Sequence, residues 1–242
     1  MKKGIIFDVD GTLWDSAVPV AQSWNEVLKR RYPEVERRIT PEDMYRNMGK
    51  TMDAIGDDLF PFLEPAKRTE VMEACMEYEN EYLAAHPGDM YPHMVSVLSA
   101  LSSRYALFIV SNCQTGYIEA LMASCGIGAY VADTECFGAT GRPKGDNIRL
   151  VMERNGLEKC FYVGDTAMDQ EASRQAGIPF LYLPPTDSAR RRERMRLSPP
   201  LRSCPGSRKK FWDNRQTRKD QEERNQPGRK GASCGGPGLF FK

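Results

Sequence analysis

Short apolar runs recur along the chain with the pattern of strands that are buried on both faces. Four are clear, namely Lys3 to Val9, Ala106 to Val110, Cys160 to Val163 and Pro179 to Leu183, and Tyr130 to Asp133 is a weaker fifth. Continuous apolar runs of this length are typical of a parallel sheet that helices cover on both sides. The pattern therefore predicts five parallel strands.

Apolar residues with helical spacing fill the segments between these runs. Tyr117 to Cys125, Gly145 to Asn155 and Ala167 to Ala176 have this spacing, and Gly177 is placed to end the last of these helices. A further helix is expected from Met94 to Leu101. Alternation of strand and helix predicts the α/β class, with a doubly wound, Rossmann-like core.

The segment after the first strand breaks this alternation. Between Ser16 and Ala85 the apolar residues keep helical spacing, and no strand pattern is convincing. The residues spaced in this way are Val20, Trp24, Val27, Leu28, Met72, Cys75, Met76 and Tyr82. We predict an α-helical cap over residues 16–86, inserted into an α/β core that comprises residues 1–15 and 87–183.

The composition is that of a soluble globular protein and not of a membrane-spanning one. Hydrophobic residues make up 40% of the 242 positions and charged residues 28%, and no apolar run approaches the roughly 20 residues that cross a bilayer. The N-terminus has neither a signal-peptide core nor a cleavage site. The seven cysteines form no Cys-x-x-Cys pair, which favours free thiols over a zinc site or disulfides. We expect a soluble, cytoplasmic protein with no membrane partner.

The small net charge conceals two unlike parts of the chain. Residues 184–242 hold 16 Lys and Arg against 6 Asp and Glu, whereas residues 1–183 carry a net charge of −9. The tail is rich in Pro, Gly, Arg and Lys, and its apolar residues show no period. A segment of this composition is predicted to be disordered.

Polar side chains collect where the predicted strands end. Asp8 and Asp10 follow the first strand, and Ser111 follows the second strand along the chain. Asp165 follows the predicted strand Cys160 to Val163, and Asp169 comes one turn later. Ligands of open α/β sheets bind beyond the carboxyl ends of the strands, where the strand order reverses. Converging carboxylates repel one another unless a cation lies between them, and hard oxygen ligands suit Mg²⁺. The pattern predicts a magnesium site at this edge.

These segments together resemble the four ordered motifs of haloacid dehalogenase-type phosphatases. The motifs are Asp8-x-Asp10-Gly-Thr-Leu-Trp-Asp, Ser111-Asn, Lys144 and Gly164-Asp-Thr-x-x-Asp169. The resemblance covers Met1 to about Leu183, and it looks closest to the branch of phosphoglycolate phosphatase and β-phosphoglucomutase, whose members carry a helical cap. It implies a Mg²⁺-dependent hydrolase that removes a phosphoryl group from a small phosphorylated metabolite.

The resemblance also implies catalytic roles. Asp8 is expected to attack the phosphorus and form an aspartyl-phosphate, while Asp10 acts as general acid and then as general base. Ser111 and Lys144 are expected to hold the phosphoryl oxygens that move in the reaction. The expected magnesium ligands are Asp8, Asp10 through its backbone carbonyl, Asp165, and Asp169, which could instead pair with Lys144.

Substrate binding is assigned to residues on both sides of the expected cleft. In the core these are Thr12 and Asn112, which belong to the first and second motifs. In the cap, Gly49 and Lys50 lie in a loop between two predicted helices, in a segment that often faces the substrate in similar proteins. We expect a monomer or a homodimer.

Each motif also has a simpler interpretation. Asp-Gly is common turn chemistry, and acidic residues such as Asp165 and Asp169 often cap a following helix. Lys144 could be a solvated lysine whose role belongs to Arg142. The occurrence of all four motifs in the required order favours the catalytic interpretation.

Two alternatives concern the whole chain. A phosphomutase of the same family would pass the phosphoryl group to a sugar. A non-catalytic protein could bind RNA or another polyanion through the basic tail, although nucleic acid is not expected as a partner of the phosphatase. A dehalogenase is disfavoured because the metal-binding acids and Asp10 suit phosphoryl transfer.

The tail departs from the pattern of the family, whose members usually continue with a glycine-rich turn, a short strand and a closing helix. Codons for Leu183 to Arg196 that are read two bases out of phase can encode Ala-Ala-Tyr-Gly-Phe-Gly-Lys-Ala-Glu-Gly-Ala-Asp-Ala, which looks like this continuation. We therefore favour a frameshift near Leu183 as the origin of residues 184–242. Sequencing the gene tests this hypothesis.

Overall fold

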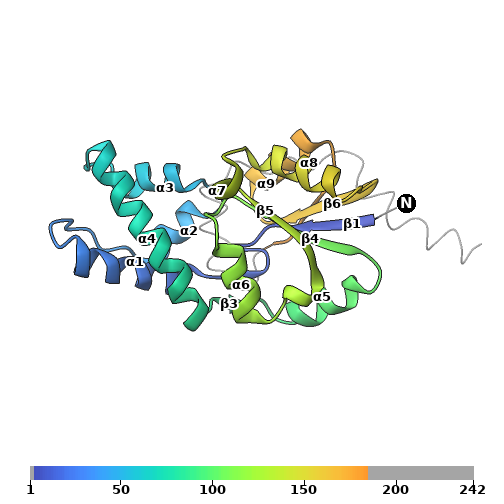
Figure 1. Ribbon diagram of the computed structural model, residues 1–242, viewed down its shortest axis with the longest axis horizontal. Helices are drawn as coiled ribbons and strands as arrows, with labels where there is room; N and C mark the ends of the chain where they lie inside the picture. The colour runs from blue at the N-terminus through green and yellow to red at the C-terminus, as the bar shows by residue number, and fades with distance from the viewer. Residues whose placement is uncertain (1–2, 185–242) are drawn as a thin grey trace, which may run out of the picture. The chain divides into compact units, whose positions relative to one another are not determined.

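A five-stranded parallel sheet forms the centre of the computed structural model, which describes residues 3–184 (Figure 1). Its strands, in spatial order, are β5 (Val131–Cys136), β4 (Ala106–Ser111), β1 (Lys3–Phe7), β6 (Lys159–Gly164) and β7 (Phe180–Tyr182). All five predicted strands are confirmed. The chain moves outward from β1 to β4 and β5, and then returns to β6 and β7 on the other side of β1, so the strand order reverses at β1.

Helices cover both faces of the sheet, as the continuous apolar runs require. Helices α5 (Met94–Ser102) and α6 (Tyr117–Cys125) pack on one face, and α8 (Lys144–Arg154) and α9 (Ala167–Ala176) pack on the other. Consecutive strand residues point to opposite faces, so Ile5 joins the first cluster and Ile6 the second. The short helices η1 (Gly128–Tyr130) and α7 (Phe137–Thr140) flank β5.

The predicted helices of the core begin and end close to their expected limits. Gly177 adopts the left-handed conformation with φ of 75°, which ends α9 as expected. At the other end of α9, Thr166 and Asp169 form a reciprocal capping box. This interaction fixes the first turn of α9 against the end of β6.

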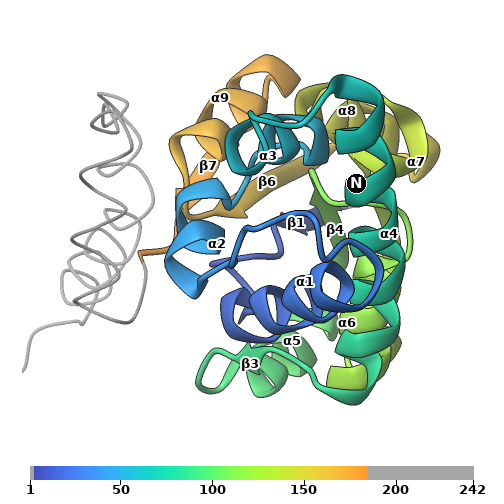
Figure 2. The same ribbon diagram turned by 90° about the vertical axis from the view of Figure 1, so that its left-hand side faces the viewer.

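Four helices form the predicted insert between β1 and β4. They are α1 (Ala17–Arg31), α2 (Pro41–Asn47), α3 (Met52–Leu59) and α4 (Pro65–Ala85). The helices lie together beyond the carboxyl ends of the strands, as Figure 2 shows from the side of the insert. The helical cap is therefore confirmed, and its limits at residues 16 and 86 remain a prediction.

The sequence did not indicate the two-stranded antiparallel sheet at the base of the cap. Strand β2 (Trp14–Asp15) pairs with β3 (Asp89–Met90), so the chain enters and leaves the cap side by side. Two residues are too few to show the alternation of apolar and polar residues by which a strand is recognised. The pairing depends on contacts between distant segments.

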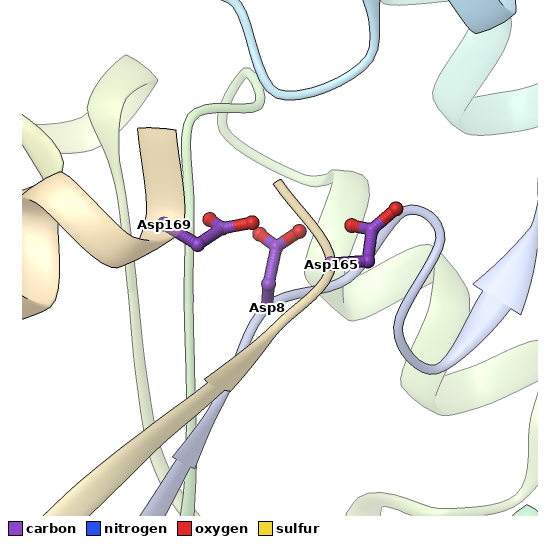
Figure 3. Close-up of side chains that lie close together, drawn as sticks. All are labelled: Asp8, Asp165 and Asp169. Atoms are coloured by element: carbon purple, nitrogen blue, oxygen red, sulfur yellow. The ribbon is translucent and has the colours of Figure 1, made fainter. Parts of the chain in front are cut away.

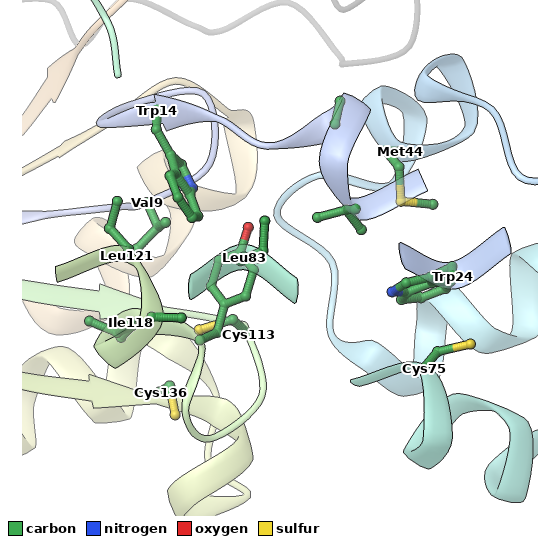
Figure 4. Packing of buried hydrophobic residues seen from close by; sticks show 14 of the residues in the cluster. Val9, Trp14, Trp24, Met44, Cys75, Leu83, Cys113, Ile118, Leu121 and Cys136 are labelled. Carbon is green, nitrogen blue, oxygen red and sulfur yellow. The ribbon is translucent and has the colours of Figure 1, made fainter. Parts of the chain in front are cut away.

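One apolar cluster continues from the core into the cap (Figure 4). Trp14 at the base of the cap and Trp24 of α1 are both fully buried within it, and Leu83 of α4 and Leu121 of α6 also belong to it. Because the cluster spans both parts, the cap in this structure is closed against the core.

Several expectations fall partly or wholly outside the described residues. The predicted disorder and frameshift of residues 184–242 concern a segment of which only Pro184 is described. Within residues 3–184, no helix is both long enough and apolar enough to cross a membrane. The five cysteines of this range are free thiols.

Candidate active site

Asp8, the expected nucleophile, lies one residue beyond the end of the central strand β1. Its backbone N–H donates to the carbonyl of Val163 in β6, at 2.9 Å, which continues the strand pairing to this residue. Because β1 lies where the strand order reverses, its end is flanked by the ends of both β4 and β6. Residues from three separate segments can therefore converge on Asp8.

Lys144 joins Asp8 to Asp169. Its Nζ atom lies 2.9 Å from Oδ1 of Asp8 and 2.7 Å from Oδ1 of Asp169, and all three side chains are buried. Lys144 opens α8, whereas the neighbouring Arg142 is exposed. The structure thus brings Lys144 into the site and leaves Arg142 outside it.

Asp165 completes a group of three buried acids with Asp8 and Asp169 (Figure 3). Each offers a carboxylate oxygen, and these oxygens lie within 4.8 Å of one another. Three hard oxygen donors from the ends of two adjacent strands and the first turn of α9 match the ligand preference of Mg²⁺. The residues present therefore fit a divalent cation.

The electrostatics of the site also favour additional positive charge. Burial, and next the Asp169 carboxylate, raise the pKa of Asp8 to about 7, even though Lys144 opposes this shift. Burial lowers the pKa of Lys144, but Asp169 and Asp8 outweigh that effect and hold the pKa well above its usual value. A charged lysine alone does not compensate these acids, and a divalent cation would.

Asp169 has two structural roles besides its place in the acid group. Oδ1 accepts from Lys144, while Oδ2 accepts from the backbone N–H and the hydroxyl of Thr166 at 3.0 and 2.6 Å. A Cβ on Gly164 would lie only 2.6 Å from the Cβ of Asp169, so only glycine permits this approach. The geometry favours the pairing of Asp169 with Lys144, and its role as a metal ligand remains a prediction.

The Asp10 carboxylate belongs to a separate hydrogen-bond network. Its Oδ1 accepts from Trp14 Nε1 at 3.0 Å, from Ser16 Oγ at 2.7 Å and from Tyr117 OH at 2.7 Å. Gly11, with φ of 81°, makes the turn that follows. Three donors from the cap base and α6 therefore hold the orientation of the expected acid and base.

A pocket between cap and core opens beside Asp10. Core residues that line it include Ser111, the last residue of β4, and Asn112; from the cap, Gly49 and Lys50 take part. Asn112 Nδ2 donates to the carbonyl of Gly49 at 2.7 Å, which joins two of the expected substrate-binding residues. Thr12 does not line this pocket, and its buried hydroxyl has no partner within residues 3–184.

Sequence reasoning missed several residues of this pocket, and Glu79 of α4 is the most informative. It is only 3% exposed, and its carboxylate accepts from Trp24 Nε1 and, at 3.1 Å, from Gln114 Nε2. A signal was present, because Glu79 continues the apolar stripe that contains Met72 and Cys75. A charged residue on such a stripe indicates either a buried partner or a ligand.

The burial of Glu79 is expected to make the stability of the protein depend on pH. Burial raises its pKa to about 7 from 4.5, despite the hydrogen bonds from Trp24 and Gln114. The Glu79 carboxyl group therefore keeps its proton to a higher pH in the native state than in the unfolded state. For this reason the protein loses stability as the pH rises from 4.5 to about 7. Over this pH range we expect the free energy of unfolding of the wild type to fall by on the order of 3 kcal/mol relative to that of Glu79→Gln.

Urea unfolding of both proteins at pH 5 and pH 8 measures this difference. Glu81→Gln is the matched control, because Glu81 is an exposed residue of the same helix. Parallel pH profiles for wild type and Glu79→Gln would show that Glu79 titrates normally.

Comparison with known proteins agrees with this geometry. The family described as haloacid dehalogenase-like hydrolase matches residues 5–183. A phosphoglycolate phosphatase of Aquifex aeolicus is 29% identical over 181 residues, which cover 72% of this chain and 80% of that enzyme. A phosphoglycolate phosphatase of Escherichia coli K12 is 26% identical over 208 residues, which cover 73% and 79%.

Solved structures share the fold. The crystal structure of a predicted phosphoglycolate phosphatase from Haemophilus somnus superposes with a TM-score of 0.67 at 22% identity, covering 76% of this chain and 86% of that one. A haloacid dehalogenase-like family hydrolase from Streptococcus pneumoniae gives a TM-score of 0.65 at 20% identity, covering 80% and 91%.

Proposed function

Because the chain belongs to the haloacid dehalogenase-like hydrolases, we propose that it is a Mg²⁺-dependent phosphatase that acts on a small phosphorylated metabolite through an aspartyl-phosphate on Asp8. The observation that carries the proposal is the buried group of Asp8, Asp165 and Asp169. Lys144 joins two of these acids, Asp8 and Asp169, and a separate network orients Asp10. The curated relatives that match over most of the chain are phosphoglycolate phosphatases, which supports the same reaction class.

The first half of the reaction forms a covalent intermediate. An Asp8 carboxylate oxygen attacks the phosphorus in line, and the bond between phosphorus and the leaving oxygen breaks. Asp10 gives its proton to the leaving oxygen, and an alcohol departs. Lys144 and Ser111 hold the equatorial oxygens of the phosphoryl group, where negative charge must be stabilised.

The second half returns the enzyme to its starting state. Asp10, now ionised, takes a proton from water as the water oxygen bonds to phosphorus. The bond between phosphorus and Asp8 breaks, and inorganic phosphate leaves. Mg²⁺ held by Asp8, Asp165 and the backbone carbonyl of Asp10 would reduce the repulsion between the anionic phosphate and the anionic nucleophile.

Removal of the metal tests this proposal. We expect purified protein to release p-nitrophenol from p-nitrophenyl phosphate with Mg²⁺ and to lose nearly all of this activity with excess EDTA, because three buried acids then repel the phosphate. Adding Mg²⁺ back is expected to restore the rate, whereas sodium chloride of equal ionic strength is not. An unchanged rate in EDTA would refute a metal-dependent reaction.

A further inference from the structure

Glu79 places a carboxylate in the pocket beside Asp10. The pocket is lined by Asp10, which would protonate the leaving oxygen, and also by Glu79 and Gln114. The field of Asp10 contributes to the raised pKa of Glu79, so the two acids lie within electrostatic reach of each other. A leaving group that departs past Asp10 therefore enters a pocket that Glu79 also lines.

The surroundings of Glu79 hold its carboxylate in place rather than neutralise it. Trp24 of α1 and Gln114 of the core loop each donate one hydrogen bond to it, and both donors are uncharged. Gln114 also donates to Asn80 Oδ1 at 3.2 Å, and Asn80 Nδ2 donates to the carbonyl of Thr115 at 2.9 Å. The carboxylate is therefore fixed between cap and core, and each of its oxygens can accept a further hydrogen bond.

The pocket is small and carries few charges. It encloses about 70 Å³, which is room for roughly five water molecules. The described residues that line it include one lysine, Lys50, and two acids, Asp10 and Glu79. Lys50 Nζ already lies 2.9 Å from Asn47 Oδ1 and 3.7 Å from Asp58 Oδ2. A substrate carboxylate would be the third in this space, and Lys50, the single lysine of the described lining, already pairs with Asp58.

We propose that Glu79 is a specificity-determining residue, which selects leaving groups that carry a hydroxyl or ammonium donor and rejects those that carry a carboxylate. The inference rests on the proposed phosphatase activity and narrows its substrate to small phosphomonoesters of alcohols with a second hydrogen-bond donor. The donor of the substrate bonds to Glu79, whereas a substrate carboxylate places like charges side by side in a buried space.

Three two-carbon phosphates of equal length test this selection directly. They are 2-hydroxyethyl phosphate, phosphoethanolamine and 2-phosphoglycolate, which end in a hydroxyl, an ammonium and a carboxylate. At pH 8, we expect kcat/KM of the wild type for each donor-bearing compound to exceed that for 2-phosphoglycolate by about tenfold or more. A preference of the wild type for 2-phosphoglycolate would overturn the inference. This comparison uses the wild-type protein alone.

Glu79→Gln removes the charge and keeps the shape of the side chain. We expect this variant to bring the three kcat/KM values within about threefold of one another, chiefly because 2-phosphoglycolate is no longer repelled. Glu81→Gln is expected to keep the wild-type ratios, since it removes the same charge from an exposed position of α4. Wild-type ratios in Glu79→Gln would also overturn the inference.

Turnover of p-nitrophenyl phosphate separates this inference from the proposed function. If that turnover is absent or persists in Asp8→Asn, the phosphatase assignment itself has failed. If it is present and depends on Asp8 while 2-phosphoglycolate remains the preferred compound, the role of Glu79 alone is wrong. The same assay shows whether Glu79→Gln folds into an active protein.

Discussion

Asp8→Asn is expected to reduce Mg²⁺-dependent phosphate release by about four orders of magnitude, because it removes the attacking oxygen anion. The variant should nevertheless fold. Burial raises the pKa of Asp8 to about 7, which means that the ionised carboxylate is held at a cost in the metal-free protein. Replacing it with a neutral amide removes this cost, so we expect the melting temperature of Asp8→Asn at pH 8 without metal to equal or exceed that of the wild type.

Initial rates of phosphate release and thermal melts on the same samples check both halves of this expectation. Asp53→Asn is a suitable control, because it makes the same change at an exposed position of α3. Equal rates for wild type and Asp8→Asn would refute the nucleophile. A large loss of stability in Asp8→Asn would instead indicate a structural role for this residue.

Lys144→Met is expected to abolish activity and also to destabilise the protein by about 3–5 kcal/mol at pH 8. Methionine has a similar length and no charge, so the carboxylates of Asp8 and Asp169 would remain buried without their shared cation. Because protonation relieves the repulsion between two carboxylates, the loss of stability should be smaller at pH 5 than at pH 8. Urea unfolding at the two pH values measures this effect.

Arg142→Met is the matched control for Lys144→Met. Arg142 lies two residues earlier and is exposed, and from the sequence it was the other basic residue that could have supplied the lysine of the third motif. We expect it to keep wild-type activity and stability. If Arg142→Met lost activity and Lys144→Met kept it, the arrangement of the phosphate-binding residues would have to be reassigned.

The arrangement of the core followed from local patterns in the sequence. Runs such as Ala106 to Val110 are apolar at every position because both faces of a parallel strand are covered, and this requirement is independent of which residues cover them. The place of the site followed for a similar reason. Carboxyl ends of parallel strands meet at one edge, so Asp8, Ser111 and Asp165 had to lie near one another once their strands were identified.

Individual partners within the site did not follow from these patterns. From the sequence, Asp169 could be a metal ligand or a partner of Lys144, and Arg142 could take the role of Lys144. The choice depends on which side chain reaches Asp8 across 136 positions of the chain, which is a property of the packing of α8 against the sheet. The cap base formed by β2 and β3 was missed because two-residue strands have no period.

Strand period, helix period and motif order are local properties of a sequence. They were therefore enough to predict a parallel α/β core, a helical insert after the first strand and a set of acidic residues at one edge. The hydrogen bond from Tyr117 to Asp10 and the place of Glu79 in the same pocket depend on how the chain folds. Both side chains come from helices whose rotation is set by contacts between cap and core. The direction of a helical side chain also depends on how its helix packs. For this reason the contact of Tyr117 with Asp10 and the place of Glu79 in the pocket became visible only in the folded chain.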